Sequence, residues 1–344
     1  MRQFRIYGLW IVLLTVLTGI AGCEKEEGLY TAPDVPVGTQ SATFAMGENY
    51  ENQLWFEFST QKTASNAFGL WDIGFSLSEK NNIIINCGKH SAYTATFMES
   101  TQFRDVRFID VSKHEWTFDN PNGHPDSLSF SGWWESYQMG KAKPKDRLYI
   151  INRGADSLGA KKFIKLKMLG REGASYHFQW GLLTDTVPHD VYINAKNDYN
   201  YAYYSFSTEQ EVFNEPLTRD NWDMVITTYK QTVTEESLGT TMPYILRGVL
   251  TNPNKVKVVE LNNLIDFNQI SLSYAKALVF SNFLNEIGYD WKTWSLTANK
   301  YTVNQKKIFI ILDAKGNYFK MRFVDFYNDK GEKGYPKIAW ELLK

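Results

Sequence analysis

The stretch Trp222-Asp223-Met224-Val225-Ile226 follows an aromatic segment, Tyr203-Tyr204-Ser205-Phe206-Ser207-Thr208, and both occur twice in the chain. The earlier copy reads Trp55-Phe56-Glu57-Phe58-Ser59-Thr60 and then Trp71-Asp72-Ile73-Gly74-Phe75. Aromatic and polar residues alternate in these segments, which is typical of a half-buried β-strand. The sequence therefore predicts a tandem duplication of a β-rich unit.

Three later pairs of stretches match between the two copies in the same order. The matched pairs are 148–152 with 308–312, 163–169 with 318–324, and 178–182 with 338–342. Apolar and basic residues alternate in the second pair, as expected for a strand with one face in water. The spacing between matched positions grows slightly along the chain, which indicates small insertions in loops, where they are best tolerated.

The chain is longer than one hydrophobic core usually serves, and its length agrees with two units. We expect a signal peptide over residues 1–22, a tether over 23–40, one unit over 41–184 and a second over 190–344. Strand signals dominate, and apolar residues recur at helical spacing only in 261–287. The expected fold is mainly β, with two tandem antiparallel β units and minor helix. The two units could still share an interface or exchange a strand.

The first residues have the pattern of a targeting segment, with Arg2 and Arg5 before an apolar run. The run ends in Ile20-Ala21-Gly22-Cys23, which resembles the bacterial lipobox. That resemblance implies cleavage before Cys23 and a lipid anchor on this residue, so that the mature protein is tethered to a membrane. The alternative is a plain secretory signal whose cleavage site falls beside a cysteine.

The acidic run Glu24-Lys25-Glu26-Glu27 directly after the lipobox resembles the surface-export signal of Bacteroidetes lipoproteins. We therefore expect a lipid-anchored protein exposed on the surface of the outer membrane.

Charge and cysteine content exclude several classes of function. The chain has 37 basic and 38 acidic residues, and loss of the two leader arginines leaves 35 against 38, a net charge near −3. A chain of this charge without a basic patch does not predict a nucleic-acid partner. Cys87 is the only cysteine besides Cys23, so neither a disulfide framework nor a cysteine zinc site is expected. The chain also has no catalytic signature, and we expect no enzymatic activity.

Both halves resemble the HmuY-like family of Bacteroidetes heme-binding lipoproteins. The second half contains the family's strand motifs as Tyr204-Ser205-Phe206-Ser207 and Asn221-Trp222-Asp223-Met224, and the first half contains its Asn-x-Gly motif as Asn86-Cys87-Gly88. The closing turns correspond to 153–156 and 313–317. The resemblance implies the fold more directly than it implies a bound ligand, because these motifs belong to strands and turns.

The resemblance implies that heme is held between two axial ligands, either a histidine or a methionine pair. The family's second ligand lies five residues after a tryptophan and just before a glycine, which places Met139 between Trp134 and Gly140 in this chain. A methionine sulfur is a chemically credible iron ligand. Trp134, Tyr137 and Gly140 are the accompanying candidates for the ligand pocket. In the second half the corresponding position is Leu296, which cannot bind iron, so we expect that copy to be degenerate.

The first iron ligand remains open between His114, on an alternating segment, and His124, in a turn. His90 lies in a loop that could approach a ligand. The three histidines and Met139 also have ordinary structural explanations. A histidine in a polar segment usually faces solvent, and a methionine near a strand end usually fills a core.

The two Trp-Asp pairs have an expected structural role. We expect the rings of Trp71 and Trp222 to fill the core, and the carboxylates of Asp72 and Asp223 to accept hydrogen bonds from backbone amides.

Two functions follow as hypotheses. The first is a surface lipoprotein that binds heme or a related porphyrin and passes it to a TonB-dependent outer-membrane receptor. The alternative is a structural or interaction lipoprotein that has lost heme binding and contacts a protein or glycan partner through its aromatic loops. The position of Met139 favours the first, and Leu296 together with the unassigned first ligand favours the second.

Overall fold

A computed structural model describes most of the chain beyond the leader. The described residues are 30–31, 33, 38–47, 49–78, 80–89, 94–154, 156–194, 196–235, 239–262 and 265–344. The expected signal peptide, Cys23 and His90 lie outside these residues. The prediction of a mainly β fold with minor helix is confirmed, with several antiparallel sheets and the short helix α2 (Leu272–Lys276). None of the described helices is long and apolar enough to cross a membrane.

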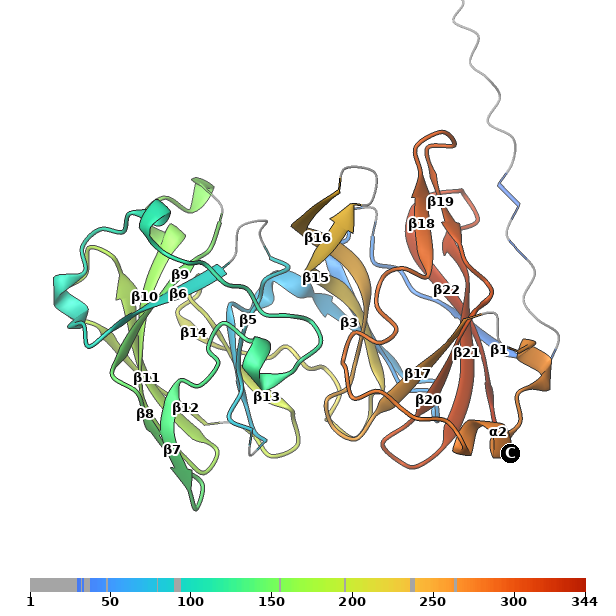
Figure 1. Ribbon diagram of the computed structural model, residues 1–344, viewed down its shortest axis with the longest axis horizontal. Helices are drawn as coiled ribbons and strands as arrows, with labels where there is room; N and C mark the ends of the chain where they lie inside the picture. Colours follow the sequence, from blue (N-terminus) through green and yellow to red (C-terminus); the bar gives the residue numbers. More distant parts are fainter. Residues whose placement is uncertain are drawn as a thin grey trace, which may run out of the picture.

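The middle of the chain forms one lobe, drawn mainly in green and yellow in Figure 1. Its strands are β4 (Ile73–Ser76), β5 (Ile83–Ile85), β6 (Thr94–Glu99), β7 (Trp134–Gln138), β8 (Lys141–Pro144), β9 (Arg147–Asn152), β10 (Phe163–Glu172), β11 (Ser175–Leu182), β12 (His189–Asn194), β13 (Tyr201–Ser205) and β14 (Gln210–Val212). They form one sheet around β10 and a smaller one in the order β14-β13-β4-β5. We call this part the middle lobe.

The two ends of the chain together form the other lobe, which we call the terminal lobe (Figure 1). Its strands are β1 (Gln40–Thr43), β2 (Asn52–Phe56), β3 (Thr63–Ala67), β15 (Met224–Glu235), β16 (Thr240–Thr251), β17 (Lys257–Asn262), β18 (Lys292–Ser295), β19 (Lys300–Val303), β20 (Lys307–Leu312), β21 (Tyr318–Tyr327) and β22 (Lys333–Leu342). The two larger sheets have the orders β1-β22-β21-β20-β17 and β16-β15-β2-β3.

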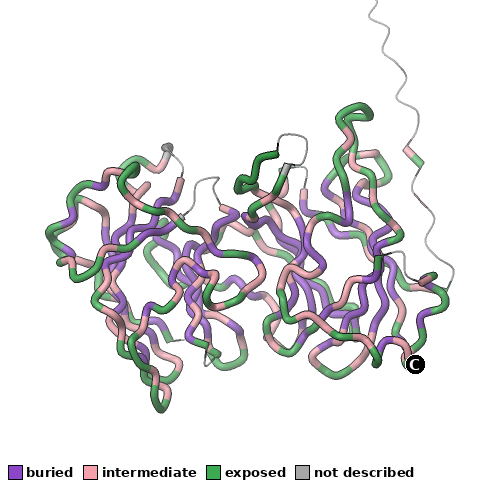
Figure 2. Tube along the Cα trace, viewed as in Figure 1, coloured by how far each residue is buried: buried purple, intermediate pink, exposed green. Residues whose placement is uncertain are grey.

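The hydrophobic cores follow these lobes, and the buried strands appear as two groups in Figure 2. The main cluster of the middle lobe draws all its buried residues from 73–206. That of the terminal lobe combines residues from 44–58 with residues from 224–340. The indoles of Trp180 and Trp340, which occupy matched positions in the two copies, are each 1% exposed, one in each cluster. Truncating a buried ring of this size costs about 3–5 kcal/mol of stability.

The division expected at 184–190 does not separate the two cores. It falls between β11 and β12, which pair along their lengths from Ser175 opposite Asn194 to Trp180 opposite His189. Likewise β2 pairs with β15, and β13 pairs with β4, so each copy contributes its first strands to the other lobe. Each lobe therefore contains strands from both expected units, which is the exchange of strands that the sequence left open.

Candidate functional site

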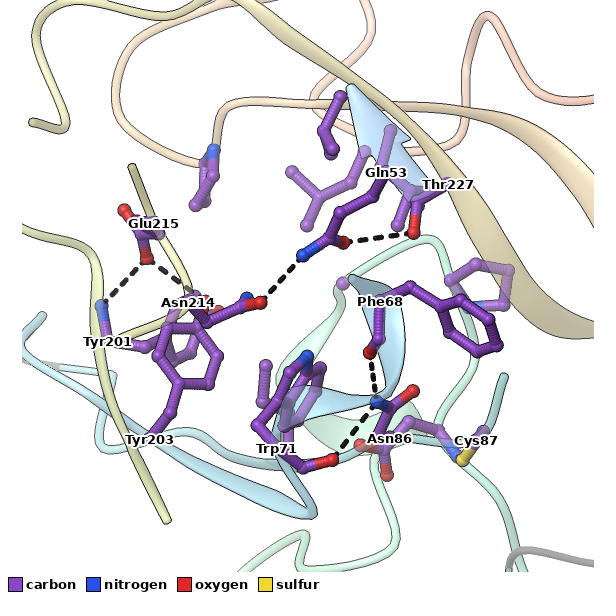
Figure 3. A pocket seen from close by; sticks show the side chains of 18 of the residues that line it. Gln53, Phe68, Trp71, Asn86, Cys87, Tyr201, Tyr203, Asn214, Glu215 and Thr227 are labelled. Carbon is purple, nitrogen blue, oxygen red and sulfur yellow. Dashed lines mark hydrogen bonds between the residues drawn. The ribbon is translucent and has the colours of Figure 1, made fainter. Parts of the chain in front are cut away.

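A pocket lies between the two lobes, where β2 and β15 of one meet β5 and β13 of the other (Figure 3). We call it the junction pocket, and its walls include Gln53, Trp71, Asn86, Tyr203, Asn214 and Trp222. The empty space between its walls is about 950 Å³, part of it open to solvent. The cavity available to a ligand is about 170 Å³, below the roughly 300–1,000 Å³ usual for drug-sized ligands, so it suits a group about the size of a single ring.

Matched residues of the two copies supply the aromatic walls. Trp55 and Trp222 meet edge to face with ring centroids 4.6 Å apart. Trp71 and Tyr203 repeat this pair at 5.0 Å. In each pair one ring comes from an aromatic segment and the other from a Trp-Asp motif. Because the copies exchange strands, each pair combines residues of both.

A chain of neutral polar side chains crosses one wall of the junction pocket (Figure 3). The hydroxyl of Thr227 donates to Gln53 Oε1 at 3.1 Å, and Gln53 Nε2 donates to Asn214 Oδ1 at 2.6 Å. Asn66 Nδ2 then donates to the carbonyl oxygen of Asn214 at 2.7 Å. These bonds fix the orientation of each amide, and therefore the positions of the donors and acceptors that remain for a ligand.

Two buried carboxyl groups also belong to the walls. Glu215 accepts hydrogen bonds from the side-chain amide of Asn200 at 3.1 Å and the hydroxyl of Tyr203 at 3.0 Å. Asp119 accepts from the backbone amides of Ile85 at 2.6 Å and Ser129 at 2.7 Å. Burial raises the pKa of Glu215 to about 7 and that of Asp119 to about 6, although these hydrogen bonds oppose the shift. Near neutral pH Glu215 is consequently only partly ionised, whereas Asp119 is mostly ionised and has its charge stabilised by the two backbone amides.

The Asn-x-Gly motif holds the floor of the pocket in place. Asn86 Nδ2 donates to the carbonyl oxygens of Phe68 at 2.8 Å and Trp71 at 3.1 Å. A Cβ on Gly88 would lie 2.2 Å from the carbonyl oxygen of Thr228, so only glycine permits this approach to β15. Between them, Cys87 is buried in the main cluster of the middle lobe. Burial raises the pKa of its thiol well above the ordinary value, so it is no thiolate ligand.

Met139 lies far from any core. It forms the turn between β7 and β8 together with Gly140, both with positive φ, and its side chain is fully exposed. Trp134 and Tyr137 lie on β7 with ring centroids 6.4 Å apart, both half-buried. The four residues that the family resemblance singled out thus occupy one hairpin, which is separate from the residues that line the junction pocket.

The structure does not bring His114 and Met139 together. The ring of His114 lies 6.5 Å from that of Trp116, which lies 6.3 Å from the ring of Phe163 at the start of β10. The carbonyl oxygen of Gly140, beside Met139, accepts from the amide of Gly173 just past the other end of β10. A strand of this length spans roughly 30 Å. These two residues therefore cannot bind opposite faces of one iron.

His124 is placed closer to the Met139 end of β10. It lines a second pocket together with Ser78, whose carbonyl oxygen accepts from Arg171 Nη1 at 2.8 Å, and Arg171 pairs with Ala142 on β8. Its side chain is 56% exposed, and its Nδ1 accepts from the amide of Asp126 at 3.3 Å. The Nε2 atom is left for another contact.

The Trp-Asp residues lie between the junction pocket and the strand ends. The Asp72 side chain is fully buried and accepts from the Phe206 amide at 2.8 Å, and that of Asp223 accepts from the Phe58 amide at 2.7 Å. Trp222 is buried with Trp55, whereas Trp71 is only half-buried. Both indoles line the pocket, so they form part of its wall and also pack between strands.

Sequence reasoning did not single out Gln53, Asn214 or Glu215. Gln53 lies on β2, where a polar residue in an alternating strand is expected to face solvent, yet it is 4% exposed. The wall that buries it is built by β15, whose pairing with β2 is invisible in a single sequence. The signals that pointed toward this site were the recurrence of tryptophan in the two motifs, the aromatic segment with Tyr203 and the Asn-x-Gly motif.

Comparisons with known proteins agree with the family resemblance. A model of the HmuY protein family matches residues 197–340, which run from the segment before β13 into β22 and so include strands of both lobes. No curated protein matches the chain.

Among solved structures, the chain is similar to apo PinO from Porphyromonas gingivitis, with 10% identity and a TM-score of 0.26, over 90% of this chain and 99% of that one. It is also similar to the apo HmuY analog TFO of Tannerella forsythia, with 12% identity and a TM-score of 0.25, over 92% and 100%. A third is an HmuY-like protein of Bacteroides vulgatus to which its name assigns heme binding, with 10% identity, a TM-score of 0.22, and coverage of 90% and 97%.

Proposed function

We propose that the protein is a non-catalytic ligand-capture lipoprotein that binds heme at the outer-membrane surface and passes it to a TonB-dependent receptor, because residues 197–340 match the model of the HmuY family. The observation that carries this proposal is the family match together with an accessible iron donor. That donor is Met139, whose thioether is fully exposed at the tip of the β7–β8 hairpin.

The hairpin tip suits capture of a large flat ligand. A two-residue turn with positive φ at both positions holds the thioether away from the sheet, so it can approach a heme iron without moving the core. Methionine sulfur is a neutral, soft donor and binds heme iron in other proteins. A site that releases its ligand again does not need buried axial donors to the iron.

Lysines of the same hairpin could receive the heme carboxylates. Lys141 pairs with Glu172 and Lys143 with Glu135, and both lysine side chains are more than 60% exposed. Exposed ion pairs of this kind contribute only about 0–1 kcal/mol, so a propionate can replace the glutamate at little cost.

The second axial ligand is the finer part of the proposal. His114 is too far from Met139, and His124 lies toward the correct end of β10 with a free Nε2. We therefore propose His124, rather than His114, as the partner of Met139. Two axial ligands would give a six-coordinate heme, and Met139 alone would give a five-coordinate heme or one completed by water.

The test is a titration of the purified protein with hemin, read in the Soret and visible bands under oxidising and reducing conditions. We expect saturation at one equivalent, tighter binding after reduction because a neutral thioether favours ferrous iron, and a changed spectrum in Met139→Ala. Leu296→Ala is the matched control, since Leu296 is equally a solvent-facing residue, 88% exposed, at the turn after β18.

The outcomes separate the parts of the proposal. A spectrum that changes in His124→Ala as well as in Met139→Ala supports the assigned pair. A spectrum unchanged by Met139→Ala rejects this site, and a flat titration in both redox states rejects heme capture altogether.

A further inference from the structure

The junction pocket is chemically unsuited to heme. Among the described residues that line it there is no histidine or methionine to bind iron, and no lysine or arginine to pair with a carboxylate. Its one thiol, Cys87, is held protonated by burial and accepts from the amide of Asp119 at 3.2 Å. A pocket whose described lining holds carboxyl groups but no cation gives a ligand carboxylate no partner, so it suits a ligand without negative charge.

The walls have two kinds of chemistry. Indole and phenol rings of Trp71, Trp222 and Tyr203 provide flat apolar faces. The amides of Gln53 and Asn214, locked in one hydrogen-bonded chain, provide fixed polar groups between them (Figure 3). This combination matches a ring that is apolar on its faces and carries hydrogen-bonding groups around its edge.

Two buried polar atoms in the wall have no partner within the described chain. They are Nε1 of Trp222 and the hydroxyl of Thr228, in side chains of residues that are 4% and 7% exposed. An unsatisfied buried donor or hydroxyl costs about 1–3 kcal/mol, so a ligand that supplied a partner to these two atoms would recover part of that cost. Asn86 places both protons of its amide nitrogen on backbone carbonyls, which leaves its Oδ1 to accept. A ligand with several hydroxyl groups would satisfy these atoms.

We propose that the junction pocket is a second binding site, which takes one neutral sugar residue of a glycan. The C–H faces of a pyranose ring would stack on the indole of Trp71, and its hydroxyls would meet the amide chain. The position between the lobes explains why each copy alone could not form the site. This proposal is independent of heme capture, because no residue of the β7–β8 hairpin lines the pocket.

The test is saturation-transfer NMR of the purified protein, without hemin, with D-glucose, D-galactose, D-mannose and N-acetyl-D-glucosamine as separate probes. We expect transfer to the ring C–H protons of at least one probe, with affinity in the millimolar range that is typical of a single sugar. Trp71→Ala should weaken that affinity at least about tenfold, and Trp71→Phe, which keeps a ring face, should retain it within about threefold.

Two further variants guard against a simple folding defect. Ile84→Trp fills the pocket from β5 while it keeps an apolar side chain, and it should abolish transfer. Trp294→Ala removes a ring on β18, remote from the pocket lining, and should change nothing. Absence of transfer from all four probes overturns the proposal, as does transfer that persists at full strength in Ile84→Trp. The outcome of the separate hemin titration does not affect the interpretation of this sugar-binding test.

Discussion

The carboxylate of Asp223 accepts a hydrogen bond from the backbone amide of Phe58 at 2.7 Å, although the two residues are 165 positions apart. Asp72 and Phe206 repeat this contact at 2.8 Å. Each Trp-Asp motif therefore holds the end of the aromatic strand that belongs to the other copy. This reciprocal contact fixes how the copies exchange their first strands, and it positions the indoles that line the junction pocket.

The two carboxylates have opposite electrostatic surroundings. Asp72 pairs with Arg153 at 3.2 Å and with Lys89 at 2.8 Å, and the first pair is fully buried. At the position matched to Arg153 the second copy has Asp313, which lies near Asp223 together with Glu57. Burial, with these two acids adding to it, raises the pKa of Asp223 to about 7.

Substitution of the two aspartates by asparagine should therefore have unequal effects. Asp72→Asn leaves the guanidinium of Arg153 buried without its counter-ion, and we expect a loss of about 3–5 kcal/mol in the free energy of unfolding. Asp223→Asn keeps an acceptor for the Phe58 amide and removes a poorly solvated charge, so we expect a change within about 1 kcal/mol. Urea denaturation at pH 7.5 measures both, and equal losses would contradict this account.

Stability should fall as the pH rises from 5 to 7. The pKa of Asp223 is raised to about 7, that of Glu215 to about 7 and that of Asp119 to about 6, all above their unfolded values near 4. The folded state therefore holds more protons than the unfolded state across this window. The stability that these three groups contribute is fully present below pH 4 and is lost as the pH rises through their pKa values in the folded state. Since one pKa unit corresponds to about 1.4 kcal/mol and the three groups act together, we expect a decrease on the order of 5 kcal/mol, measured by urea denaturation at several pH values.

The buried Lys292 sets the upper limit of the pH range over which stability should fall. Burial lowers the pKa of Lys292 to about 7, so below pH 7 it is protonated in both states and adds no slope. Above pH 7 its effect has the opposite sign, because only the unfolded state keeps the proton up to about pH 10.

In Asp223→Asn the decrease in stability between pH 5 and 7 should be smaller than in the natural protein. An unchanged slope would show that Asp223 does not titrate there.

Local pattern was enough to predict the strands. The aromatic segments, the stretches after each Trp-Asp motif and the closing stretches of both copies all form strands, among them β10 and β21 in the alternating apolar and basic runs. Strand alternation depends on neighbours two residues apart, so one sequence contains it. Within the described part of 261–287, where helical spacing was expected, the structure has the short helix α2 and one 3-10 turn at Phe267–Gln269, and most of the rest is irregular chain.

Pairing between distant strands could not be predicted in the same way. Duplicated strands have similar faces, so β2 could pair within its own copy or with β15, and the sequence does not distinguish the two. The junction pocket depends on that choice, which is why Gln53 and Glu215 were missed. The separation of His114 from Met139 also depends on sheet order and not on their spacing along the chain.

Removal of the lipid attachment site should release the protein from the membrane. Ile20-Ala21-Gly22-Cys23 resembles a lipobox, which predicts lipid attachment at Cys23. Cys23→Ala removes the sulfur that would carry the diacylglycerol, so we expect the variant in the soluble fraction or as an uncleaved precursor. Fractionation of cells that express each form, followed by mass spectrometry of the amino terminus, provides the measurement. Equal membrane partitioning of the natural and Cys23→Ala proteins would rule out the anchor.

A contiguous fragment of the middle lobe should fold independently of the rest of the chain. Residues 71–220 contain every strand from β4 to β14, the whole main cluster of that lobe and both partners of the contact between Asp72 and Phe206. We expect this fragment to unfold in one cooperative urea transition.

A fragment of similar length, 41–184, provides the matched control. It follows the boundaries expected from the sequence, but it separates β4 from its partner β13, β11 from β12 and β2 from β15. Unpaired strands leave backbone amides and apolar faces exposed, so we expect this fragment to aggregate or to show no cooperative transition. If the 41–184 fragment unfolded cooperatively and the 71–220 fragment did not, each copy would fold as its own unit. The exchanged strands would then not be needed for either core.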